Sequence, residues 1–61
     1  MITVFVHDLS EEKINEIKQA IINYGAILES KKNDYEVSFH CKDIYTKRLI
    51  CKEVTRIKAA K

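Results

Sequence analysis

The sequence predicts a small α+β protein: a two-layer sandwich, β-α-β-β-α, in which both helices cover one face of a three-stranded mixed sheet. Three observations lead to this prediction. The first residues are β-branched and aromatic, two later segments repeat apolar residues at helical spacing, and two alternating runs flank an Asn-Asp pair. The chain of 61 residues is expected to form a single domain, residues 1–61.

Residues Ile2 to His7 are predicted to form the first strand, because Ile, Thr, Val and Phe suit a pleated, half-buried surface. One face of this strand is wholly apolar and carries Ile2, Val4 and Val6. This face is expected to point into the core.

The first helix has a clear start and a clear end. Ser10 is the expected N-cap, and two acidic residues follow it in the first turn, where the helix dipole favours negative charge. Gly25 supplies the left-handed residue that ends a helix, and it is the only glycine in the chain. The expected buried stripe consists of Ile14, Ile17, Ala20, Ile21 and Tyr24.

Residues Ala26 to Lys32 and Tyr35 to Cys41 are predicted to form a hairpin that turns at Asn33-Asp34. In the register that this turn sets, Leu28 lies opposite Phe39 and Ile27 opposite His40. The favoured sheet places the third strand between the other two and antiparallel to both. The alternative places the first strand in the centre, beside the second.

This order of elements resembles the ferredoxin-like split β-α-β unit without its last strand. The likeness is one of topology.

Residues Asp43 to Lys61 are predicted to form an amphipathic helix with two different faces. At about 100° per residue, Ile50, Val54 and Ile57 lie on one narrow stripe. The opposite side gathers the candidate nucleic-acid-binding residues Tyr45, Arg48, Lys52 and Arg56.

Charge is distributed unevenly along the chain, although the net charge is only +2. Residues 8–29 hold five acids and two lysines, a balance of −3, whereas residues 42–61 hold seven bases and two acids, a balance of +5. Lys and Arg bind phosphates, and a tyrosine among them can stack on a base. We therefore expect a small accessory protein that binds nucleic acid through the last helix. The competing interpretation is a solvated basic face whose cations near the C-terminus are favoured by the helix dipole.

The open face of the sheet is the second candidate surface. Its expected partner-binding residues are Thr3, Phe5, Ile27, Ser38 and His40. A chain this short buries only about 60% of its unfolded surface, so association is one source of added stability. The alternative function is therefore a protein-interaction module, either a homodimer or a small inhibitor, that uses this face or binds an acidic partner on the basic helix.

Enzymatic, metal and membrane functions are not expected. His40, Cys41 and Cys51 lack the paired spacing of a zinc site, and neighbouring strand residues point to opposite faces. No catalytic motif, cofactor-binding glycine loop or cleavable leader is present, and no apolar run approaches the ~20 residues that span a membrane. We therefore expect a cytoplasmic, non-enzymatic protein without cofactor or metal, with Cys41 in the core and Cys51 at the edge of the apolar stripe.

Overall fold

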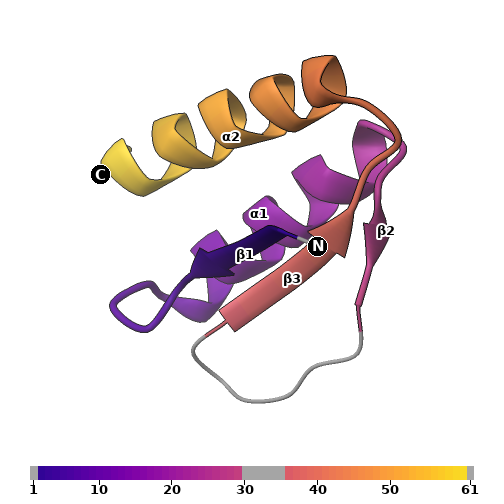
Figure 1. Cartoon of the computed structure of the whole chain (residues 1–61). Coiled ribbons are helices and arrows are strands. Elements are labelled where there is room, and N and C mark those ends of the chain that lie inside the picture. Colours follow the sequence, from indigo (N-terminus) through magenta and orange to yellow (C-terminus); the bar gives the residue numbers. More distant parts are fainter. Residues whose placement is uncertain (1, 30–35, 61) are drawn as a thin grey trace.

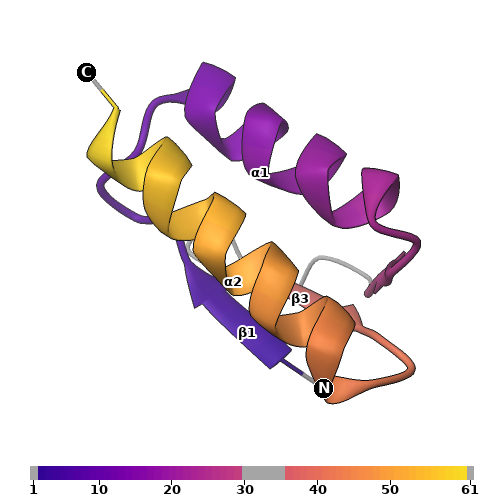
Figure 2. The same ribbon diagram turned by 90° about the horizontal axis from the view of Figure 1, so that it is seen from above.

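The computed structural model describes residues 2–29 and 36–60 and contains two layers, one of strands and one of helices (Figure 1). Both helices lie on the same side of the sheet, and they run side by side above it (Figure 2). The elements in chain order are β1 Ile2–Phe5, α1 Glu11–Asn23, β2 Ile27–Leu28, β3 Glu36–His40 and α2 Ile44–Ala59. The predicted α+β sandwich and its β-α-β-β-α order are confirmed.

The strands follow the spatial order β1-β3-β2, so the third strand is central, as favoured from the sequence. β1 pairs antiparallel with β3, with Thr3 opposite Ser38 and Val4 opposite Val37. β2 also pairs antiparallel with β3. Both pairings in the sheet are therefore antiparallel. Of the predicted mixed sheet, one feature remains: the two outer strands, β1 and β2, run parallel to each other on either side of β3. The alternative order with β1 in the centre is wrong.

The predicted hairpin register is confirmed where the structure describes it. Ile27 lies opposite His40 and Leu28 opposite Phe39. The hydrogen bonding between these two segments continues one residue beyond β2, where the Glu29 N–H donates to the Ser38 carbonyl at 2.9 Å. The strands are shorter than predicted, and the predicted Asn33-Asp34 turn lies outside the described residues.

The ends of α1 form where the predicted capping residues stand. The Ser10 side chain accepts the backbone N–H of Lys13 at 3.3 Å. At the other end, Gly25 has a φ of 84° and donates its N–H to the Ile22 carbonyl, while the Ala26 N–H reaches the Ile21 carbonyl. These two bonds make a Schellman motif, which needs the positive φ that glycine adopts without steric cost. A Cβ atom added at Gly25 would have no neighbour within 4 Å, so it is the positive φ that favours glycine here.

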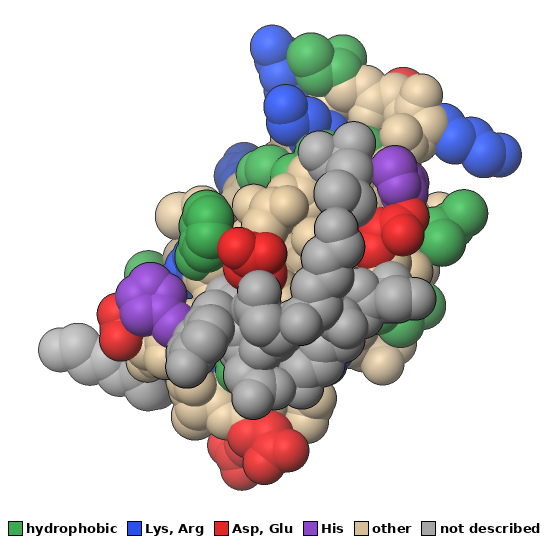
Figure 3. All heavy atoms as spheres, turned by 60° about the horizontal axis from the view of Figure 1, so that its bottom comes forward, with side chains coloured by type: hydrophobic (Ala, Val, Ile, Leu, Met, Phe, Trp, Pro, Cys, Tyr) green, Lys and Arg blue, Asp and Glu red, His purple; other side chains and the backbone are tan. Residues whose placement is uncertain are grey.

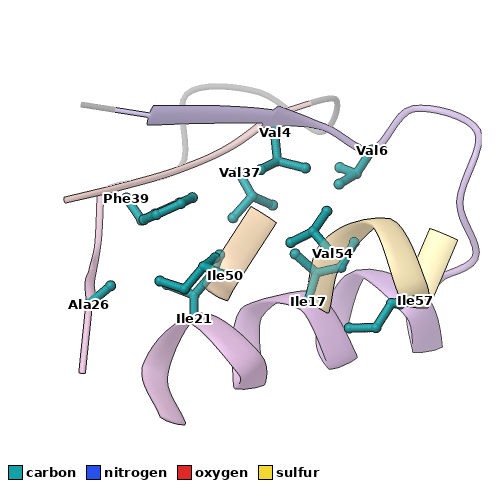
Figure 4. Packing of buried hydrophobic residues seen from close by; sticks show 10 residues of the cluster. All are labelled: Val4, Val6, Ile17, Ile21, Ala26, Val37, Phe39, Ile50, Val54 and Ile57. Atoms are coloured by element: carbon teal, nitrogen blue, oxygen red, sulfur yellow. The ribbon is translucent and has the colours of Figure 1, made fainter. Parts of the chain in front are cut away.

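The core is one apolar cluster between the sheet and the two helices (Figure 4). Phe39, Ile17, Ile21 and Ile50 are fully buried within it. Its members are Val4, Val6, Ile17, Ile21, Ala26, Val37, Phe39, Ile50, Val54 and Ile57. The predicted inward faces of β1, β3 and α2 all contribute to it.

Three side chains lie differently from expectation. Tyr24 was expected in the buried stripe of α1 but is exposed, because it is the C-cap, where the backbone leaves helical geometry. Cys41 is only half-buried and packs against the core from its rim. Cys51 is exposed, because its position on α2 is about 100° away from Ile50 and outside the buried stripe.

The packing makes a prediction about stability that compares two isoleucines of α2. Ile50 is fully buried and Ile44 is 66% exposed. Ile50→Val removes a buried methyl group and is expected to lower the free energy of unfolding by about 0.5–1.5 kcal/mol. Ile44→Val is the control and is expected to change it by less than about 0.5 kcal/mol. Urea unfolding measures both, and equal midpoints for the two variants would contradict the observed orientation of α2.

Candidate nucleic-acid interface

The orientation of α2 is set by its cap and by its buried stripe. The Asp43 carboxylate accepts the Thr46 N–H at 2.7 Å and starts the helix. Ile50, Val54 and Ile57 then point into the core. As a result, all four predicted nucleic-acid-binding residues, Tyr45, Arg48, Lys52 and Arg56, are exposed on the outer side. The helix ends at Ala59, two residues before the predicted end.

Arg56 differs from the other three because it is engaged by acidic residues. Its guanidinium donates through Nε to Glu53 Oε1 at 2.8 Å, and Nη2 contacts the same oxygen. The hydrogen bond and the charge of Glu53 raise the pKa of Arg56, and the charge of Glu16 on α1 adds to this effect. Arg56 therefore stands in an ion pair on the side of α2 nearer α1, and a phosphate would have to compete with Glu53 for it.

Arg48 and Lys52 are in a different situation. Neither forms an ion pair with a carboxylate in the part of the chain that the structure describes. Tyr45 is 71% exposed and lies three residues before Arg48, at the spacing that makes helix side chains neighbours. We call Tyr45, Arg48 and Lys52 the outer strip of α2. Lys42 and Lys47 flank it and are also exposed.

The helix dipole does not account for the cations of the outer strip. Positive side chains are favoured in the last turn of a helix, where Arg56 and Lys58 stand. Lys47 and Arg48 lie instead in the second turn, and the first turn contains no acid. In Figure 3, which looks toward the open sheet face, Lys and Arg side chains gather at the top of the view, while acidic side chains lie on that face and below it. Local helix stability thus explains the cations at one end of α2 only.

The open sheet face carries the second predicted set, Thr3, Phe5, Ile27, Ser38 and His40, and the pairing register places all five on it. Three of these five side chains already make polar contacts within the face. Thr3 Oγ1 and Ser38 Oγ are 3.2 Å apart, and His40 Nε2 contacts Glu29 Oε1.

The two large apolar side chains of this face are separated from each other. Phe5 is 57% exposed and lies opposite Glu36, whereas Ile27 is 69% exposed and lies opposite His40. This register puts them about 14 Å apart along the sheet and about 10 Å apart across it. Among the residues that the structure describes, Phe5 and Ile27 are not neighbours.

One shallow hollow lies beside the end of β1, lined by Phe5, His7, Asp8, Leu9 and Lys58. Its volume is about 220 Å³, smaller than the range typical of small-molecule sites. His7 Nε2 lies 3.2 Å from Asp8 Oδ2 at the surface. Within residues 2–29 and 36–60, no three side chains of metal-binding type come together, and both cysteines are free thiols.

Sequence reasoning missed two features of α2. The Glu53–Arg56 pair has the three-residue spacing of helical ion pairs, so the signal was present in the sequence. Ile44, which is exposed beside Tyr45, lies about 120° around the helix from Ile50, so the helical period also carried this signal.

Comparison with protein-family models, curated proteins and solved structures finds no match to this chain. In the ranges that the structure describes, no helix combines the length and the apolar character of a membrane span.

The cap of α2 predicts a pH dependence of stability. Accepting the Thr46 N–H lowers the pKa of Asp43 below its ordinary value of 3.8. A lowered pKa in the folded state stabilises the protein above the unfolded-state pKa, and this contribution is lost as the pH falls through the folded-state pKa. Asp43→Ser keeps a capping oxygen without a titrating group. We therefore expect the wild type to lose more stability than Asp43→Ser between about pH 6 and about pH 2. Urea midpoints across this range test it, and parallel curves would refute it.

Proposed function

We propose that this protein is a small non-enzymatic accessory protein that binds nucleic acid through the outer strip of α2. The observation that supports the proposal is the exposure of Arg48 and Lys52 beside exposed Tyr45, with no described carboxylate paired to either cation. Cations that are free of carboxylates can contact phosphates without first breaking an ion pair. Each contact releases a condensed counterion, which is the main source of affinity for nucleic acid.

The strip is small, and this limits the affinity. Arg48 and Lys52, together with the flanking Lys42 and Lys47, offer about four phosphate contacts. On a log–log plot, the association constant is expected to fall with salt concentration with a slope of about −3. Binding is therefore expected at low salt and to weaken by tens of fold between ~50 and ~200 mM salt.

Charge reversal tests this function. Arg48→Glu with Lys52→Glu removes both central phosphate contacts and is expected to abolish binding of a labelled oligonucleotide in fluorescence anisotropy at low salt. Lys18→Glu with Lys58→Glu is the matched control, because it makes the same change in net charge at residues outside the strip. The control is expected to retain binding. Equal losses in both double variants, or no binding by the wild type at low salt, would overturn the proposal.

A second candidate is a protein-interaction module, either a homodimer or a small inhibitor that acts through the open sheet face. The exposure of Phe5 and Ile27 supports it, although the two side chains lie at different corners. An acidic protein on the outer strip is the other form of this candidate, since the same cations would attract its carboxylates.

Sedimentation equilibrium tests the homodimer. If the open face is the interface, the wild type associates as its concentration rises, and Phe5→Ser with Ile27→Ser makes it monomeric. Ile22→Ser is the control, because Ile22 is equally apolar and 51% exposed but lies on α1. A wild type that stays monomeric at high concentration would exclude the dimer.

A further inference from the structure

The two central cations of the outer strip, Arg48 and Lys52, form one short line along α2. Neither residue is paired with a described carboxylate, whereas the next cation on this side of the helix, Arg56, is paired with Glu53. From Tyr45 to Lys52 the helix rises only about 10 Å. The surface is thus long enough for a few phosphates of one strand.

The position of α1 beside α2 makes the two flanks of the outer strip different. The helices are antiparallel neighbours, and Lys13 Nζ near the start of α1 donates to the Ile57 carbonyl near the end of α2 at 2.9 Å (Figure 2). Glu16 on α1 is the carboxylate whose charge acts on Arg56, and the cation on the same side of α1, Lys13, is held by the Ile57 carbonyl. The opposite flank of α2 carries Lys47 and Lys58.

A DNA duplex would place a phosphate strand on each side of a helix in its major groove, which is about 12 Å wide. On the α1 side of α2 that strand would meet the Glu53–Arg56 ion pair, which has no net charge, and the carboxylate of Glu16, which repels phosphate. A single strand needs only the one line of cations. The arrangement of charge therefore favours one strand over two.

Tyr45 gives a second, independent reason to expect a single strand as the ligand. Tyr45 is 71% exposed. It lies three residues before Arg48 and seven before Lys52, on the same side of the helix. A protein aromatic ring can stack on a base only when that base is free of its neighbours, as in single strands, loops and ends.

We infer that the outer strip of α2 takes single-stranded nucleic acid, with adjacent phosphates on Arg48 and Lys52 and one unstacked base against the ring of Tyr45. This inference rests on the proposed function and narrows it to one class of ligand. Each base stacked on an aromatic side chain strengthens binding roughly 5- to 150-fold.

Fluorescence anisotropy with a labelled oligothymidylate and a labelled duplex at ~50 mM salt tests the inference. The single strand is expected to bind more tightly than the duplex. Tyr45→Ala is expected to weaken the single strand roughly 5- to 150-fold and to leave the duplex unchanged. Tyr45→Phe keeps the ring and is expected to bind like the wild type. Ile44→Ala, which truncates the exposed neighbour, is the control and is expected to have no effect.

The outcomes separate this inference from the function on which it rests. Equal affinity for strand and duplex, or equal effects of Tyr45→Ala and Ile44→Ala, would overturn the single-strand assignment. If Arg48→Glu with Lys52→Glu still abolished binding, nucleic-acid binding itself would stand. No binding of either probe would overturn both.

Discussion

The burial of one sheet face around Phe39 is the interaction on which this fold depends. Phe39 is fully buried on the central strand, and both helices bring fully buried isoleucines to the same cluster, among them Ile17 and Ile50. A chain of 61 residues has little other apolar surface to bury, so this cluster must supply most of the stabilisation. It also sets the rotation of α2: because Ile50 and its stripe point inward, Tyr45, Arg48 and Lys52 must point outward.

The packing of α1 beside α2 then divides the cations of α2 into two groups. Near its C-terminal end, Lys13 of α1 binds a carbonyl of α2, and Glu16 lies close enough to act on the charge of Arg56. Near the N-terminal end, the described part of the chain has no acid paired with Arg48 or Lys52. The four residues that the sequence places on one basic side of the helix are therefore not equivalent in the structure. Arg48 and Lys52 have no described carboxylate partner, whereas Arg56 is paired with Glu53 and lies near Glu16. This asymmetry supports one bound strand in place of a duplex.

Much of the architecture could be predicted from local patterns. Ser10 and Gly25 marked the ends of α1 correctly, because caps depend on the side chain and backbone of one or two residues. The alternating apolar run from Tyr35 to Cys41 favoured the third strand as the central one, because a central strand has two neighbours, and the strand order agrees. Tyr24 was misplaced because a helical wheel assumes regular geometry up to the last residue, and the C-cap departs from it.

The sequence by itself determined the order of elements, the direction of the apolar faces and the identity of the exposed basic side of α2. These properties follow from periodicities of two and 3.6 residues, which each segment carries alone. The tertiary structure decided which cations stay free and how far apart Phe5 and Ile27 lie on the sheet. The charge of Glu16 acts on Arg56 only because α1 lies beside α2. The separation of Phe5 and Ile27 depends on two strand registers at once.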